Sequence, residues 1–314
     1  MRRIALAASV LASSAALSVQ MASAGPVYVA LGDSITFGET DLSYVRSAGD
    51  RGYVGLYADV LSARNGGARP AVVNLAIDGE TASSFMTGAG RVPPVTGRTD
   101  TVLAAENLNY DPNAPGSQSA KFLATVAAQK AAGNTIDTVS ITLGFNDLST
   151  AIGKDPAGVA ATLAAYRAGY SSVLSEIRQQ LPSTNLLVLG YFNPFPADPN
   201  SPAAPVFNAY GMQLNGIIRD LAGQYGGTFV DTAPPFVGNE STLTYLGQMP
   251  HGTVVGGPFG GTEPIGNVHP NAAGYAAIAA RVAAVPEPAT VGLLAAGCLG
   301  LLVAGRLRTA AIRA

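Results

Sequence analysis

Cysteine, histidine and tryptophan are nearly absent from this chain of 314 residues. The single cysteine, Cys298, has no partner for an internal disulfide and cannot form a cysteine metal cluster. A zinc site is hard to build from two histidines, His251 and His269, although carboxylates could still hold Mg²⁺ or Ca²⁺. Without tryptophan, stacking on a carbohydrate would fall to the 12 Tyr and 10 Phe. We expect neither a metal nor a cofactor.

Charged residues are also scarce, at 12% of the chain against 48% hydrophobic residues. That apolar share is ample for a buried core and argues against disorder. The net charge is −2, and five of the 18 basic residues lie in the two end segments described next, so the central part is more acidic than the whole. A body of that sign repels phosphate backbones, and we expect no nucleic-acid partner.

Both ends of the chain have the composition of export signals. Residues 1–24 start with a pair of arginines after Met, continue as an apolar run and end in Ala-Ser-Ala, as a secretory signal peptide does. Residues 285–314 contain a Pro-Glu-Pro triplet, an apolar run over 291–305 and a basic tail. That order resembles the PEP-CTERM sorting signal of Gram-negative bacteria, which implies an exosortase-type sorting enzyme as a partner. The run is short for a full membrane span, and a plain C-terminal anchor is the alternative. Both place the body in the periplasm, at the cell surface or outside the cell, at least transiently anchored.

The remaining residues, 25–284, predict one α/β domain. Short apolar runs with little alternation indicate strands buried on both faces, as in a parallel sheet. They are 27–31, 71–76, 138–143, 186–191 and 228–230. Apolar residues at steps of three and four predict helices between the strands. The clearest helices are expected over 159–181, capped by Asp155 and Pro156, and over 207–221, with weaker patterns at 54–63, 118–132 and 271–283.

Three segments rich in Gly, Pro, Asn and Ser are expected to be long loops, 80–116, 193–205 and 246–268. Loops of this length in a compact domain usually form walls or lids of a functional site. Strands that alternate with helices imply three layers, with the active site beyond the carboxyl ends of the strands.

Four short blocks place reactive side chains at those strand ends. Ser34 follows the first strand in the sequence GDSI, where its hydroxyl would be exposed on a tight turn. Gly79 follows the second strand and Asn146 the third, and both can donate a hydrogen bond to a developing oxyanion. His269 precedes a proline at the start of the last helix. Taken singly, each block is a common turn, cap or surface residue.

In this order, the blocks GDSI, IDGETA, LGFND and VHPNAAGY resemble the four motif regions of the SGNH (GDSL-type) hydrolases, over about residues 27–284. The resemblance implies a flavodoxin-like α/β/α fold with about five parallel strands in the order 2-1-3-4-5. It also implies Ser34 as nucleophile and His269 as general base. The implied oxyanion donors are the N–H of Ser34, the N–H of Gly79 and the side chain of Asn146.

One position departs from the family pattern. The family usually has an aspartate three residues before the histidine, where this chain has Gly266. Three kinds of acceptor could orient His269 instead: a backbone carbonyl of the 263–267 loop, the side-chain oxygen of Asn267, or the carboxylate of Glu263 or Asp231. We favour the backbone carbonyl, because the five glycines between residues 256 and 266 let the backbone bend close to the ring.

The function indicated is hydrolysis of a carboxylic ester through an acyl-serine intermediate, by a monomer acting on a small-molecule, lipid or acylated-sugar ester. Two alternatives remain open. A surface or matrix protein could have kept the fold and lost turnover, which the missing aspartate favours. A phosphoesterase could use the GDSI turn as an anion nest, but it would need a metal or a basic cluster, and Lys and Arg are sparse near these motifs.

Overall fold

The computed structural model describes residues 25–38, 52–91, 116–255, 261–262 and 265–286. The expected signal peptide and nearly all of the expected sorting signal lie outside these residues. Within the described part of the chain, no helix is long and apolar enough to cross a membrane.

The central sheet consists of five parallel strands in the order β2-β1-β3-β4-β5, which confirms the expected topology. All the strands are three to eight residues long, and β1, β3 and β4 are buried along most of their length, as their apolar sequences predict. Their bounds are β1 Pro26–Gly32, β2 Ala71–Asn74, β3 Thr135–Thr142, β4 Asn185–Leu189 and β5 Thr228–Val230.

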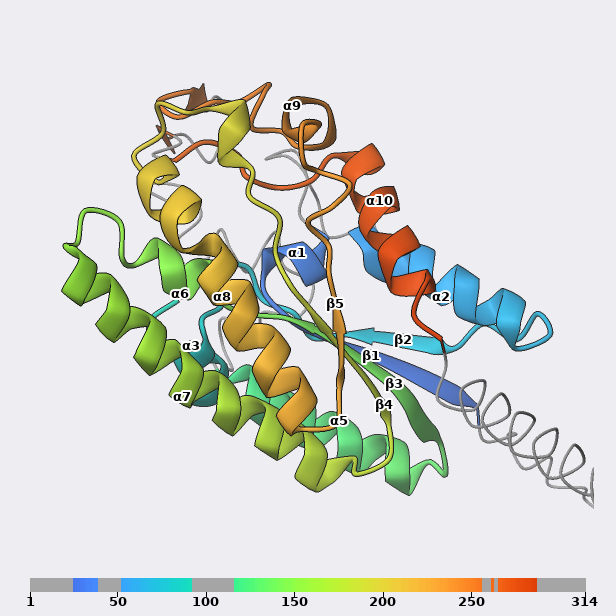
Figure 1. Ribbon diagram of the computed structural model, residues 1–314. Coiled ribbons are helices and arrows are strands. Elements are labelled where there is room, and N and C mark those ends of the chain that lie inside the picture. Colours follow the sequence, from blue (N-terminus) through green and yellow to red (C-terminus); the bar gives the residue numbers. More distant parts are fainter. Residues whose placement is uncertain (1–24, 39–51, 92–115, 256–260, 263–264, 287–314) are drawn as a thin grey trace, which may run out of the picture.

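Long helices cover both faces of this sheet and complete the three layers (Figure 1). On one side, α2 (Gly52–Arg64) packs against α10 (Ala272–Ala283). On the other side lie α5 (Gln118–Ala131), α7 (Pro156–Gln180) and α8 (Ala204–Gln224). All five expected helices are therefore present, within a few residues of their expected bounds.

The longest helix, α7, forms for the reasons that its sequence predicts. The side chain of Asp155 caps it by accepting a hydrogen bond from Gly158 N–H at 2.7 Å, and Pro156 occupies the first turn. Its apolar stripe is buried, including Tyr166 and Tyr170. Since most helical stability in proteins comes from the packing of an apolar face, this stripe is what stabilises α7 in the fold.

The segments expected to be irregular contain short elements that periodicity did not reveal. The 80–116 segment includes α3 (Ala82–Thr87), which a capping box between Thr81 and Ser84 starts. The other short elements are α1 (Ser34–Phe37), α6 (Phe145–Ser149), the 3₁₀ turn η2 (Phe195–Ala197), α9 (Glu240–Leu243), and the strand pair β6 (Val254–Val255) and β7 (Gly261–Thr262). Each is too short to show a helical or alternating pattern in the sequence.

Candidate active site

The turn that carries Ser34 is fixed at the carboxyl end of β1. Gly32 has φ of 119°, and a Cβ atom there would lie 1.8 Å from the carbonyl oxygen of Thr142, so only glycine fits. Asp33 then caps α1 by accepting a hydrogen bond from Ile35 N–H at 3.1 Å. Ser34 is therefore the first residue of a short helix, with a side chain that is largely buried.

Asp33 also connects this turn to the end of β3 and to the segment after β4. Thr142 Oγ1, at the end of β3, donates to the Asp33 carboxylate at 2.8 Å, and the hydroxyl of Tyr191, after β4, donates to its other oxygen. Burial raises the pKa of Asp33 to about 7, against the lowering effect of these hydrogen bonds. The nucleophile turn is thus tied to β3 and to the segment after β4.

The expected oxyanion donors lie on the two loops beside this turn. Gly79 has φ of 70°, which glycine adopts at no steric cost, and Asn146 lies in α6. Asn146 Nδ2 donates one hydrogen to the carbonyl of Glu80 at 3.0 Å, so its second amide hydrogen stays available. Among the described residues, no acceptor is bonded to the N–H of Ser34 or of Gly79. These groups can therefore serve a ligand.

A partly buried carboxylate holds α6 against α3. Both oxygens of Asp147 lie 3.1 Å from Ala82 N, and burial raises the pKa of Asp147 to about 7. Gly144, which precedes α6, has φ of 138°, and a Cβ there would lie 2.7 Å from the Tyr166 hydroxyl. The position of Asn146 is thus set by close packing on one side and by a hydrogen-bonded carboxylate on the other.

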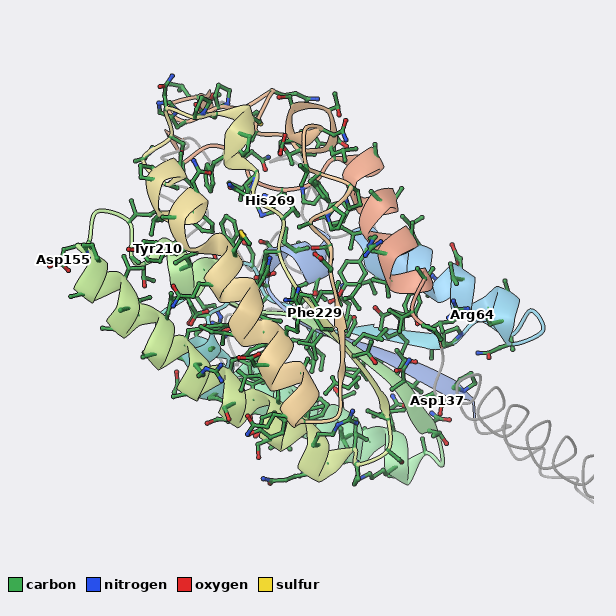
Figure 2. All side chains as sticks on the ribbon, in the orientation of Figure 1. Arg64, Asp137, Asp155, Tyr210, Phe229 and His269 are labelled. Carbon is green, nitrogen blue, oxygen red and sulfur yellow. The ribbon has the colours of Figure 1, made fainter. Side chains whose placement is uncertain are left out.

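His269 is buried and oriented by the side chain of Asn267. Asn267 Oδ1 lies 2.8 Å from His269 Nδ1 and accepts a hydrogen bond from the His269 backbone N–H at 3.1 Å. A backbone N–H can only donate, which identifies the nearby Asn267 atom as the oxygen. Nδ1 must therefore carry a hydrogen, and Nε2 is the ring nitrogen able to accept a proton. Figure 2 shows His269 beyond the upper ends of the strands.

The acceptor that we favoured from the sequence is therefore wrong. An amide oxygen rather than a backbone carbonyl partners His269, because the turn over 267–269 folds the Asn267 side chain back onto the ring. The carboxylate of Asp231 instead accepts from Ala233 N–H at 3.1 Å, in the turn after β5. Glu263 lies outside the described residues.

Gly266, where the family usually has its aspartate, has no room for a side chain. Its φ is 84°, and a Cβ atom there would lie 2.2 Å from Leu246 Cδ1. An aspartate at this position would force the Leu246 side chain to move, would bring its Cβ within 3.0 Å of Met249 O and His251 N, and would hold its backbone at a strained positive φ. The conformation and packing of the loop thus disfavour an aspartate at the position where the family usually has it.

The elements that carry Ser34 and His269 meet on α2. A Cβ atom at Gly52, the first residue of α2, would contact both Gly38, which ends α1, and the ring of Tyr275 in α10. Among the hydrogen bonds of the described residues, none joins the Ser34 and His269 side chains directly. Such bonds are often long in ligand-free enzymes and shorten when substrate binds.

Comparison with known proteins agrees with this arrangement. The GDSL-like Lipase/Acylhydrolase family matches residues 30–277. The chain belongs to this family. It is an ester hydrolase of the SGNH/GDSL type. No curated protein sequence gives a significant match to this hydrolase.

Several solved structures are similar to the hydrolase in fold. A lipase from a goat rumen metagenome has 18% identity and a TM-score of 0.53, over 81% of this chain and 94% of that one. An acetylxylan esterase from Geobacillus stearothermophilus has 21% identity and a TM-score of 0.48, over 85% and 97% of the two chains. Phospholipase A1 from Streptomyces albidoflavus has 22% identity and a TM-score of 0.45, over 81% and 96%. At such identities the likeness concerns the fold alone.

The second histidine of the hydrolase, His251, contacts a carboxylate that no sequence pattern connects with it. His251 Nδ1 is in close contact with the carboxylate of Asp198, which also accepts from His251 N–H at 2.9 Å. Burial raises the pKa of Asp198, but the bonds from His251 outweigh this effect and lower it. In the same segment, the carbonyl of Met249 accepts from Asn267 N–H at 2.9 Å. The pair therefore supports the loop that holds Asn267.

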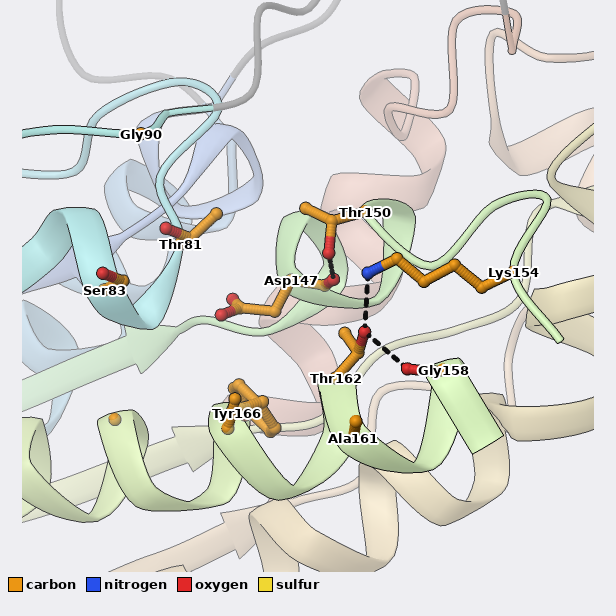
Figure 3. A pocket seen from close by; sticks show the side chains of 12 residues that line it. Thr81, Ser83, Gly90, Asp147, Thr150, Lys154, Gly158, Ala161, Thr162 and Tyr166 are labelled. Atoms are coloured by element: carbon orange, nitrogen blue, oxygen red, sulfur yellow. Dashed lines mark hydrogen bonds between the residues drawn. The ribbon is translucent and has the colours of Figure 1, made fainter. Parts of the chain in front are cut away.

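Two cavities flank the site of the hydrolase. One, of about 580 Å³, lies between α3, α6 and the start of α7 and is lined by hydroxyl groups, by Asp147 and by Lys154, whose ammonium group donates to Thr162 at 3.0 Å (Figure 3). The other, of about 280 Å³, lies between α8 and the segments after β4 and β5, and its lining includes four aromatic residues. The stacked rings of Phe192 and Phe236, with centroids 3.8 Å apart, form part of its wall.

In the described part of the chain, no group of three or more His, Cys, Asp or Glu side chains is placed to hold a metal.

Proposed function

We propose that this hydrolase cleaves carboxylic esters through an acyl-serine intermediate, with Ser34 as nucleophile and His269 as general base. The observation that supports this most directly is the hydrogen bond from His269 Nδ1 to Asn267, which leaves Nε2 unprotonated in the neutral ring. Serine is a weak nucleophile until a base accepts its proton, and a neutral imidazole nitrogen is suited to that task.

The steps follow from these assignments. Ser34 Oγ attacks the ester carbonyl while Nε2 takes the hydroxyl proton, and the carbonyl oxygen becomes an oxyanion. The N–H groups of Ser34 and Gly79 and the second amide hydrogen of Asn146 stabilise that charge. His269 then returns the proton to the leaving alcohol, which leaves the acyl group on Ser34. Water, activated by the same Nε2, attacks the acyl-enzyme and releases the acid.

The substrate that we propose is a small-molecule, lipid or acylated-sugar ester, met outside the inner membrane. Residues 1–24 would direct export and residues 285–314 would be processed by an exosortase-type enzyme. These proposals rest on the sequences of the two ends. Mass spectrometry of the exported protein, in a cell with a matching sorting enzyme, tests the second one. A mature protein that lacks the chain after Pro288 supports sorting, whereas an intact Arg313-Ala314 end supports a simple anchor.

A fluorophosphonate probe tests the nucleophile, because a base-activated serine attacks phosphorus as it attacks carbon. Intact-mass measurement should show one adduct on the folded protein and none on the Ser34→Ala variant. The same pair of proteins should be assayed on p-nitrophenyl esters of increasing chain length, acetylated xylan and p-nitrophenyl phosphate. Absence of an adduct on the folded protein would reject the serine mechanism, and turnover of the phosphate alone would establish the phosphoesterase instead.

A further inference from the structure

The side chain of Gln118, the first residue of α5, lies fully buried against the end of β1. Its Oε1 accepts a hydrogen bond from Gly32 N–H at 2.6 Å, and its Nε2 donates to the Gly32 carbonyl at 2.8 Å. One amide therefore satisfies both backbone groups of the residue that lies two positions before Ser34. Since the acceptor faces an N–H and the donor faces a carbonyl, the orientation of the amide is fixed.

The second hydrogen of Gln118 Nε2 reaches the other wall of the site. It is donated to Glu80 Oε2 at 3.0 Å. Glu80 is also fully buried, and its other oxygen contacts the Ser84 hydroxyl and lies 3.3 Å from Arg91 Nε. Burial raises the pKa of Glu80, while Arg91 and these hydrogen bonds oppose the rise. Gln118 thus connects the nucleophile strand to a buried carboxylate on the loop after β2.

That carboxylate belongs to Glu80, whose backbone contacts or adjoins two of the proposed oxyanion donors. Glu80 follows Gly79 directly, and the Glu80 carbonyl holds Asn146 Nδ2 at 3.0 Å. Each proposed donor is therefore close to a group that Gln118 or Glu80 holds. Ser34 follows Gly32 by two residues, Gly79 precedes Glu80, and Asn146 is bonded to the Glu80 carbonyl. A shift of Gly32 relative to Glu80 would change the spacing between the N–H of Ser34 and the other two donors.

We propose that Gln118 is a positioning residue that sets the spacing of the oxyanion donors, acting through Gly32 and Glu80. The inference rests on the proposed function, since it assigns a role in the same site. Gln118 does not touch the reacting atoms. Its role needs one acceptor and two donors on one rigid group, which an amide supplies and a carboxylate or an alkyl chain does not. Misplacement of catalytic groups by about 1 Å can lower a rate about 10²-fold.

The test compares Gln118→Leu and Gln118→Glu with Ser119→Ala as the matched control. Ser119 is the next residue of α5, is also buried, and donates to Glu176 at 2.9 Å, away from the site. For Gln118→Leu we expect kcat on p-nitrophenyl acetate to fall about 10–100-fold with KM within about twofold. Binding of phenylboronic acid, which forms a tetrahedral adduct with the serine, should weaken in parallel. Ser119→Ala should leave both quantities unchanged.

Gln118→Glu gives a readout that a purely structural role would not produce. The introduced carboxyl group can accept from Gly32 N–H, but it can donate only when it is protonated. Its kcat relative to the wild type should therefore rise as the pH is lowered, whereas the corresponding ratio for Gln118→Leu should stay flat. Melting curves at each assay pH establish that the variants are folded, and the glutamate variant decides the question if the leucine variant does not fold.

The results distinguish a failure of the proposed function from a failure of the role assigned to Gln118. A folded wild-type protein that neither hydrolyses esters nor reacts with the fluorophosphonate overturns the proposed function. An active wild type overturns only the role of Gln118 if folded Gln118→Leu keeps kcat within twofold, or loses kcat without weaker boronate binding. A flat pH ratio for Gln118→Glu has the same consequence.

Discussion

The two halves of the site are held in different ways. On the nucleophile side, the turn around Ser34 and the loops around Gly79 and Asn146 are joined by side chains from distant parts of the chain. On the histidine side, His269 is oriented by Asn267, only two residues before it. The nucleophile side is therefore a product of the whole fold, whereas the histidine side depends on one local turn and on the 246–251 segment packed against it.

The two sides also differ in charge. Three carboxylates with raised pKa values support the nucleophile side, the buried Asp33 and Glu80 and the partly buried Asp147. The histidine has a neutral amide where most serine hydrolases place a carboxylate. An amide fixes the tautomer of the ring, but it stabilises the imidazolium less than a carboxylate does. Among the described residues, the group that orients His269 therefore carries no charge, and we expect modest turnover.

The largest effect should come from the base itself. His269→Ala removes the group that accepts the Ser34 proton, and kcat should fall about 10⁴-fold or more. Ester hydrolysis by this variant, corrected for the uncatalysed rate, measures the loss. His251→Ala is the comparison, because that ring pairs with Asp198 and supports the loop of Asn267 without accepting the Ser34 proton, so its loss of kcat should be far smaller. A larger loss for His251→Ala would show that the wrong histidine has been assigned.

The next largest effect should lie on the nucleophile side. Asn146→Ala removes one oxyanion donor, so kcat should fall about 10²–10³-fold with little change in KM. Steady-state kinetics on a p-nitrophenyl ester measures both constants. The same substitution also breaks the bond to the Glu80 carbonyl, so melting curves are needed beside the kinetics. A lower melting temperature with unchanged kcat would make Asn146 a structural residue of α6.

Much of the framework could be predicted from the sequence. Buried parallel strands leave short apolar runs, and the stripe of α7 follows a clear helical period, so both were found within a few residues. The strand order came from the resemblance to the family, because parallel strands of similar composition carry no information about their neighbours. Ser34, Gly79, Asn146 and His269 were predicted as site residues because each lies in a motif at a strand end or helix start.

The supporting residues could not be found in this way. Gln118 lies 86 residues from its partner Gly32, and Tyr191 lies 158 residues from Asp33, so no local pattern connects them. The capping box of α3 is visible in the sequence only once the boundary at Thr81 is known. The role of Asn267 was misjudged because the conformation of the turn, rather than the spacing, decides that its side chain folds back to the ring.

A third prediction addresses the missing charge. Asn267→Ala removes the acceptor of Nδ1 and should lower kcat about 10–100-fold, since the ring loses its orientation but not its basicity. Asn267→Asp supplies a carboxylate at the same place and should raise kcat above the wild type by about tenfold, as an acid partner stabilises the imidazolium. Steady-state kinetics at a pH well above the titration of the new carboxylate measures both changes.

Gly266→Asp is the informative comparison for this pair. It restores the residue of the family pattern, but its side chain would collide with Leu246, so it should destabilise the protein and not raise kcat. If Gly266→Asp were more active than Asn267→Asp, the 246–251 segment would have to move at little cost in stability. The claim that this segment and the 267–269 turn fix the orientation of His269 would then be wrong.

The smallest effect concerns stability rather than rate, and it arises on the nucleophile side. The folded protein holds the pKa of Asp147 at about 7, because burial disfavours its charged form, whereas an unfolded aspartate has a pKa of about 3.9. Its contribution to stability is therefore fully present below about pH 4 and is lost as the pH rises through 7.

Asp147→Asn cannot ionise and keeps an oxygen that can accept from Ala82 N–H. Between pH 5 and pH 8, the free energy of unfolding of this variant should rise relative to that of the wild type, by about 2 kcal/mol. Urea denaturation of both proteins at the two pH values measures the change, and titrating groups that do not interact with Asp147 cancel in the difference. A relative change of the opposite sign would mean that the hydrogen bonds from Ala82 outweigh burial, and that this carboxylate is charged in the folded enzyme at neutral pH.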